Sequence, residues 1–119
     1  MEELSSRSRI PVSELRLLLS DCGRTQLSMN ICAFRDFVES DLELDGALEV
    51  KRRALPKACG IELGRAQMVW EAERDRECQE ETLDAEGGSM RPMLISACKA
   101  RANKTRIASV KKVWACPLM

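Results

Sequence analysis

The chain has 119 residues, a length typical of one domain, with 19 basic and 19 acidic side chains and neither His nor Tyr. The missing imidazole excludes His-based catalytic triads, dyads and metal sites. The net charge of zero conceals a split, because residues 1–86 carry 12 basic and 19 acidic side chains, whereas residues 87–119 carry seven basic side chains and no acidic one. We therefore expect a single domain in two parts, an acidic helical region at 1–86 and a basic segment at 87–119.

The N-terminal part is polar and rich in Ser and Arg over residues 1–10, which predicts a frayed end. A helix is predicted over about 11–22, because Val12, Leu15 and Leu18 recur at helical spacing. Gly23 suits the position just after a helix end.

The strongest helical pattern lies between residues 27 and 42. We expect this helix, with Ser28 as its N-cap, to nucleate the core, because it holds both Phe residues of the chain. Within it, Phe34 is expected to be among the positions most sensitive to truncation. Five apolar residues recur at intervals of four, three, four and four: Leu27, Ile31, Phe34, Val38 and Leu42.

Residues 42–55 fit two interpretations. Leucines alternate around Asp45-Gly46, a dipeptide typical of hairpin turns. A two-residue turn, however, would place these leucines opposite Ala47 and Glu49. A three-residue turn would require Gly at position 47, where the chain has Ala. Helix propensity, together with the stop at Pro56, favours a helix over about 46–55 instead.

The second half of the chain begins with a predicted break at 56–60, followed by helical propensity over 61–86. Ten of the 16 residues from 71 to 86 are charged, which predicts a solvated helix. Gly87-Gly88 indicates a hinge, and Pro92 fits the first turn of a long basic helix running towards residue 115. The expected fold class is mainly α, with about four or five helices and a basic C-terminal helix or tail.

The opposite charges on either side of the hinge predict that residues 93–112 fold back along residues 71–86. Exposed ion pairs contribute only about 0.2–1 kcal/mol each and weaken in salt. We therefore expect this docking to be marginal and salt-sensitive.

Six cysteines lie at positions 22, 32, 59, 78, 98 and 116. An even number allows three bridges in a secreted chain of this size. The opening Met-Glu-Glu-Leu is acidic and lacks the apolar core of a signal peptide, and no segment has the apolar length of a membrane span. These features predict a cytoplasmic protein whose first five cysteines are reduced, buried thiols.

The last four residues, Cys116-Pro117-Leu118-Met119, match the C-a-a-X pattern, so Cys116 is a candidate for farnesylation. A single lipid needs a second membrane signal. In the same segment Ser109 follows Arg106 as a basophilic kinase site would require, and it is a candidate for phosphorylation. A polybasic patch supplies that second signal and comprises Lys99, Arg101, Lys104, Arg106, Lys111 and Lys112.

No motif in the sequence indicates catalysis, a metal or a cofactor. The sequence therefore predicts a small, non-enzymatic intracellular protein that acts by interaction with a protein partner of unknown identity. A first alternative is a peripheral membrane protein, held on an anionic membrane by lipidated Cys116 and the polybasic patch. A second and less favoured alternative is nucleic-acid binding through the basic segment, because only Trp114 there offers an aromatic ring.

Overall fold

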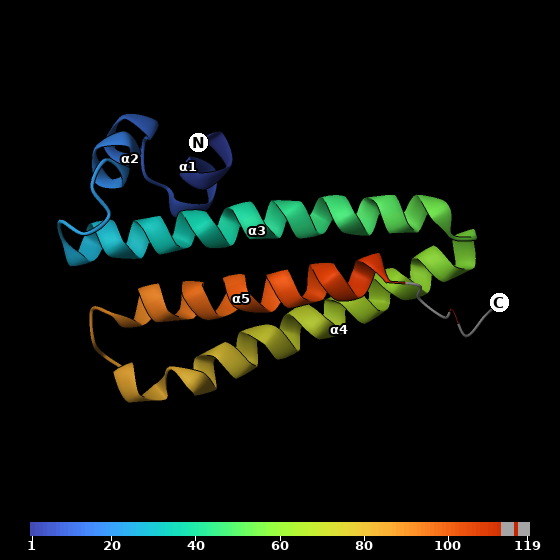
Figure 1. Ribbon diagram of the computed structural model, residues 1–119. Helices are drawn as coiled ribbons and strands as arrows, with labels where there is room; N and C mark the ends of the chain where they lie inside the picture. The colour runs from blue at the N-terminus through green and yellow to red at the C-terminus, as the bar shows by residue number, and fades with distance from the viewer. Residues whose placement is uncertain (113–115, 117–119) are drawn as a thin grey trace.

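The computed structural model describes residues 1–112 and 116. Those residues form helices and no strands, which confirms the predicted mainly α class. Figure 1 shows the order of the elements along the chain. They are α1 (Glu2–Ser8), α2 (Val12–Leu19), α3 (Gln26–Ala54), α4 (Lys57–Glu81), the short 3-10 helix η1 (Leu83–Ala85) and α5 (Arg91–Lys111).

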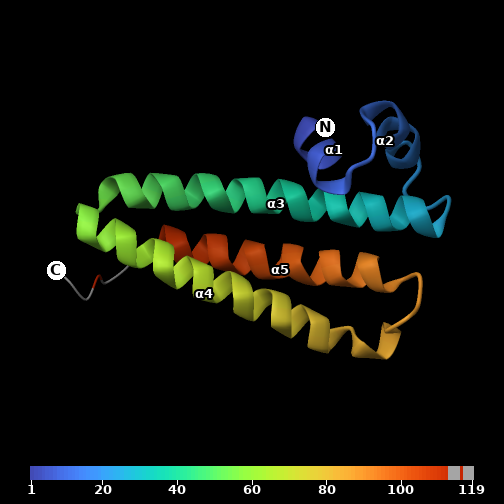
Figure 2. The ribbon, with the colours of Figure 1, turned by 180° about the vertical axis from the view of Figure 1, so that it is seen from behind.

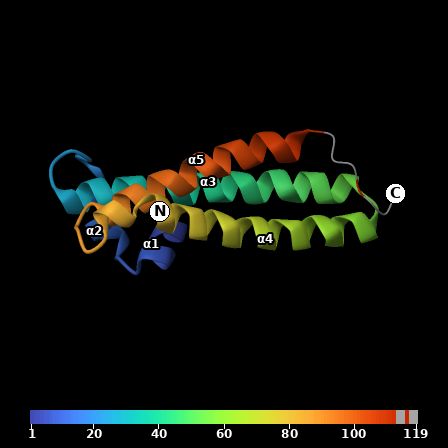
Figure 3. The same cartoon turned by 90° about the horizontal axis from the view of Figure 1, so that it is seen from below.

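Three long helices, α3, α4 and α5, form an elongated body whose principal extents are 52 × 32 × 20 Å. The chain reverses between α3 and α4 and again between α4 and α5, so α5 runs parallel to α3 (Figures 1 and 2). The two short N-terminal helices lie across the first half of α3. Seen from below, α5 lies along α3, while α4 runs beside this pair (Figure 3).

The N-terminus is helical rather than frayed, so that prediction is wrong. Leu4 on α1 is 3% exposed and belongs to the main core cluster. The hydroxyl of Ser5 donates to the carbonyl of Ile10 at 2.6 Å, which closes the turn between α1 and α2. Burial of one leucine and this side-chain bond thus order a segment whose composition is polar.

Helix α3 is longer than predicted and continues through Asp45-Gly46. It begins one turn before the expected cap, where the backbone N–H of Ser28 donates to the hydroxyl of Thr25 at 3.0 Å. Leu44 is 1% exposed and packs in a second core cluster with Ile107. This tertiary contact stabilises an unbroken helix, so neither the hairpin nor a separate second helix forms.

The buried aromatic residue of the core is Phe37, at 8% exposure, whereas Phe34 packs at the margin of the same cluster. Two members of the predicted apolar stripe, Leu27 and Leu42, are 52% and 46% exposed. The core-facing stripe of α3 is therefore rotated from the expected one and includes Leu44 instead.

The basic helix α5 is part of the core, which corrects the expectation of marginal, salt-sensitive docking. Ala100, Ile107 and Val110 are buried, and most of their packing is against α3 rather than the acidic part of α4. The predicted boundary at 86/87 falls in the turn between α4 and α5, where Gly87 has a φ of 79° that favours glycine.

Candidate functional site

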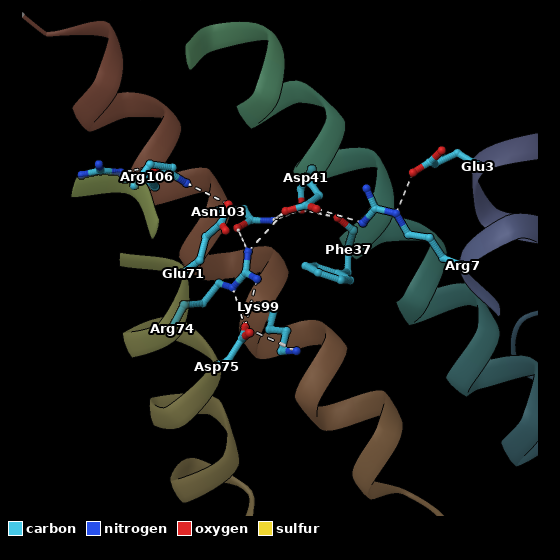
Figure 4. Close-up of polar contacts among 12 residues, drawn as sticks. Glu3, Arg7, Phe37, Asp41, Glu71, Arg74, Asp75, Lys99, Asn103 and Arg106 are labelled. Carbon is cyan, nitrogen blue, oxygen red and sulfur yellow. Dashed lines mark hydrogen bonds and ion pairs between the residues drawn. The ribbon is translucent and has the colours of Figure 1, made fainter. Parts of the chain in front are cut away.

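A polar network lies where α1, α3, α4 and α5 approach one another (Figure 4). At its centre, the carboxylate of Asp41 on α3 accepts from Arg7 at 2.9 Å and from Arg74 at 3.3 Å. Partial burial alone would lower the pKa of Arg7, but its hydrogen bonds to Asp41 and Glu3 raise that pKa overall. The network thus places one carboxylate between two guanidinium groups.

Asn103 of α5 connects this ion cluster to the rest of the bundle and is fully buried. Its carbonyl oxygen accepts from Arg74 at 2.9 Å. Its amide nitrogen donates to the hydroxyl of Ser40 at 3.0 Å and to Asp41 at 3.3 Å. Because a buried polar group is costly when unpaired, these bonds fix the register of α3, α4 and α5.

Cations and aromatic rings stack beside the network. The guanidinium of Arg74 lies 5.3 Å from the ring centre of Phe37 and 5.4 Å from that of Trp70. The ammonium of Lys99 lies 5.5 Å from the Phe37 ring, and the guanidinium of Arg106 lies 5.5 Å from the Trp70 ring. These distances suit cation–π attraction.

The arrangement is suited to holding helices together rather than to catalysis. The Asp41 carboxylate accepts hydrogen bonds from Arg7, Arg74 and Asn103, so three of its roughly four acceptor positions are occupied. Among the described residues, no buried side-chain nitrogen or oxygen lacks a partner. A network satisfied in this way offers no spare base or nucleophile to a substrate.

All six cysteines form disulfides, so the prediction of reduced thiols is wrong. The bonds join Cys22 to Cys32, Cys59 to Cys116 and Cys78 to Cys98. Disulfides form and persist in oxidising compartments, outside the cytoplasm. The even cysteine count was the signal for this outcome. It was outweighed by the acidic N-terminal sequence.

Cys116 takes part in the second of these bonds and is 6% exposed. A sulfur bonded to Cys59 has no thiol to take up a lipid, so the structure assigns Cys116 a different role from the predicted one. The other C-a-a-X residues, 117–119, lie outside the described part of the chain.

The six predicted patch residues differ in their contacts, because three of them are paired with other side chains and three are exposed. Lys99 pairs with Asp75 at 3.4 Å, and the Nε of Arg106 donates to the side-chain oxygen of Gln67 at 2.9 Å. Burial lowers the pKa of Arg106. Arg101 pairs with Glu81 at 3.0 Å. The remaining predicted residues of the segment are exposed: Lys104, Lys111, Lys112 and the candidate phosphorylation site Ser109.

Cys78, Glu81 and Cys98 are the one group of potential metal ligands in the described chain. The two sulfurs are bonded to each other and offer no thiolate, so this group does not suit a metal in the oxidised protein. Within the described residues, no helix combines the length and apolar character needed to cross a membrane.

The fold and the network define a small, disulfide-bonded helical protein whose polar side chains are used mainly for its own cohesion. The sequence profile of the family Lysozyme inhibitor LprI matches residues 20–109, and the chain belongs to this family. An uncharacterized protein of Rhizobium meliloti (strain 1021) is 33% identical to it in an alignment of 109 positions, and the alignment covers 78% of each chain. No solved structure shows a significant match.

The family assignment corrects the functional predictions. An intracellular interaction protein, a lipid-anchored membrane protein and a nucleic-acid binder are all replaced by the lysozyme inhibitor family. The cytoplasmic location is wrong, because the three disulfides and the family both indicate a location outside the cytoplasm. Lysozyme inhibitors are not enzymes, so the prediction of a non-enzymatic protein is confirmed, and the expected protein partner agrees with the family.

Proposed function

We propose that this protein binds lysozyme directly and inhibits its hydrolysis of peptidoglycan. The observation that carries the proposal is the match to the lysozyme inhibitor family over residues 20–109, which include almost all of the three-helix body. The three disulfides support it, because they maintain a binding surface in the oxidising surroundings where lysozyme acts.

A rigid body also suits inhibition on physical grounds. Disulfides and the buried polar network reduce the conformational entropy that the chain would lose on binding. The inhibitor therefore retains more of its contact energy as affinity than a flexible peptide of similar composition.

The test is the clearing rate of a suspension of peptidoglycan sacculi by lysozyme, with and without the oxidised protein. We expect the clearing rate to fall as the inhibitor concentration rises, with saturation at one inhibitor per lysozyme. The reduced and alkylated protein is the matched control and should inhibit far less. An unchanged clearing rate at a large excess of oxidised protein, across lysozymes of several classes, would reject the proposal.

A further inference from the structure

The two ends of the elongated body carry opposite charge. Residues 49–57, around the α3–α4 turn, hold four basic side chains and one acidic one, whereas residues 71–86 hold eight acidic side chains and two basic ones. Figure 1 shows the α3–α4 turn and the α4–α5 turn at opposite ends of the bundle. The protein therefore presents one basic end and one acidic end to an approaching partner.

The last turn of α5 adds to the basic end. The ammonium of Lys51 on α3 donates to the carbonyl of Lys112 at 2.7 Å, which places the end of α5 beside the end of α3. The disulfide between Cys59 and Cys116 holds Cys116 at the start of α4. The basic end is defined by six residues: Lys51, Arg52, Arg53, Lys57, Lys111 and Lys112.

Most of these charges face solvent. The side chains of Arg52 and Arg53 are 61% and 79% exposed, and both hydrogen-bond to the single carboxylate of Glu49. Those bonds lower the pKa of Glu49, the Arg52 bond most strongly. Within residues 1–112 and 116, Lys57 and Lys111 have no ion-pair partner. The basic end thus keeps an excess of positive charge that its own carboxylate does not neutralise.

Apolar surface accompanies the charge. Val50 and Ile61 are 72% and 52% exposed, so both can contribute apolar area to a contact with a partner. Val50 lines a hollow of about 380 Å³ between α3 and α5, and Ile61 lines another of about 420 Å³ beside Arg52 and Lys57. Apolar contacts ringed by arginine are typical of the centre of protein–protein interfaces.

The substrate cleft of a lysozyme is complementary to this end in charge. Glycoside hydrolases of this kind carry a pair of carboxylic acids on either side of the bond that they cleave, inside a concave site. The body is at most 32 × 20 Å across, so its basic end is narrow enough to approach such a site. The acidic end, by contrast, would set carboxylates against carboxylates, which costs affinity.

We propose that the basic end occupies the substrate cleft of lysozyme, with Arg52, Arg53 and Lys57 facing its catalytic carboxylates. This inference rests on the proposed function and specifies the surface that performs it. It makes inhibition competitive with the glycan substrate, because the inhibitor and the sugar chain occupy the same space. It also makes the charges of the basic end, rather than the polar network, the determinants of affinity.

The first test compares two charge reversals at the basic end, Arg53→Glu and Lys57→Glu, with a reversal at the other end. Arg16 on α2 is exposed and far from the α3–α4 turn, so Arg16→Glu is the matched control. We expect each basic-end variant to bind lysozyme at least about tenfold more weakly and the control to stay within about twofold. Helical circular dichroism and the absence of free thiols verify that each variant is folded.

The second test changes the partner and needs no inhibitor variant. A lysozyme whose two catalytic acids are replaced by their amides should bind the wild-type protein more weakly, and an N-acetylglucosamine oligosaccharide in the cleft should compete with it. The Arg53→Glu protein should distinguish the two lysozymes less than the wild type does, because paired charges are coupled.

The outcomes separate the two proposals. If the wild-type protein inhibits lysozyme but the basic-end variants and the amide lysozyme bind normally, the cleft assignment is overturned and the proposed function stands. If the wild-type protein neither binds nor inhibits, the proposed function fails and the cleft assignment fails with it.

Discussion

Cys78 of α4 and Cys98 of α5 are joined by a disulfide, with their Cα atoms 5.7 Å apart. The bond lies next to Arg101–Glu81, an ion pair between the same two helices. A covalent bond thus joins the acidic residues 71–86 to the basic segment. The sequence predicts that these two segments are held together by the attraction between their charges alone. This link, together with the buried face of α5, changes how the pairing should respond to salt.

We expect the overall dimensions of the oxidised protein to be independent of ionic strength. Raising salt from about 0.05 to about 0.5 M shortens the screening length to a few ångströms and weakens exposed ion pairs. The disulfides and apolar contacts are unaffected, so the radius of gyration from X-ray scattering should stay constant. An expansion at high salt would show that α5 depends on surface charge after all.

The three disulfides should contribute unequally to stability. They join residues 57, 20 and 10 positions apart, in the order Cys59–Cys116, Cys78–Cys98 and Cys22–Cys32. Loop-closure entropy predicts that replacing each pair by Ala costs roughly 4, 3 and somewhat under 3 kcal/mol of unfolding free energy, in that order. Urea denaturation of the three double variants measures this ranking, and a reversed order would contradict the entropic explanation.

Asn103→Leu should destabilise the protein although it preserves the size of the side chain. Asn103 is fully buried, and its loss leaves Arg74 and Ser40 short of a partner each. We expect a loss of about 2–4 kcal/mol in unfolding free energy. The matched control is Lys104→Ala at the exposed neighbouring position, which should change stability by less than about 0.5 kcal/mol. Equal effects would mean that the network is energetically neutral.

The two Phe residues provide a direct test of how α3 is oriented. Phe37 is buried and stacked by Arg74 and Lys99, whereas Phe34 lies at the margin of the core. Phe37→Ala should therefore cost about 3–5 kcal/mol, and Phe34→Ala clearly less. Thermal melts of the two variants give the comparison, and a more damaging Phe34→Ala would support the stripe expected from the sequence.

Asp45→Asn should slightly stabilise the protein at neutral pH. Partial burial, and then the charges of Asp41 and Glu71, raise the pKa of Asp45 above its ordinary 3.8. The ionised carboxylate is thus disfavoured in the folded state, which lowers the unfolding free energy at pH values above the folded pKa. This destabilisation disappears as the pH falls below 3.8, because the carboxyl group is then protonated in both states. Because Asp45 is largely exposed, we expect a gain below about 0.5 kcal/mol.

The measurement for Asp45→Asn is the melting temperature of variant and wild type between neutral and acidic pH, with Glu73→Gln as an exposed control. The difference should shrink towards zero in acid. A variant that is less stable at neutral pH would mean that the Asp45 carboxylate is favourably placed.

The helical class followed from local patterns, because the 3.6-residue spacing around Ile31 and Val38 survives in the structure. The length of α3 did not follow from local patterns. Asp45-Gly46 is locally typical of a turn, and the contact between Leu44 and Ile107 keeps it helical. Such a contact joins residues far apart in sequence, and no local pattern reports it. The same limit applies to the polar network around Asp41 and Asn103.

The prediction of a cytoplasmic location was wrong for a different reason. The prediction weighed the first residues of the chain above the number of cysteines, and the three pairings depend on which helices lie side by side. The predicted fold-back of residues 93–112 along residues 71–86 brings Cys78 and Cys98 close together, but the assumption of a reducing compartment left them unpaired. No spacing motif in the sequence pairs them either.

Two of the bridges are nested, since the ring closed by Cys78 and Cys98 lies wholly within the ring closed by Cys59 and Cys116. A protease that cuts the exposed Gly87-Gly88 turn therefore opens both rings yet releases neither piece. On a denaturing gel the nicked chain migrates as one species until a thiol reagent separates it into two. A protein outside the cytoplasm can thus be cleaved at this exposed turn and still keep α4 and α5 in place.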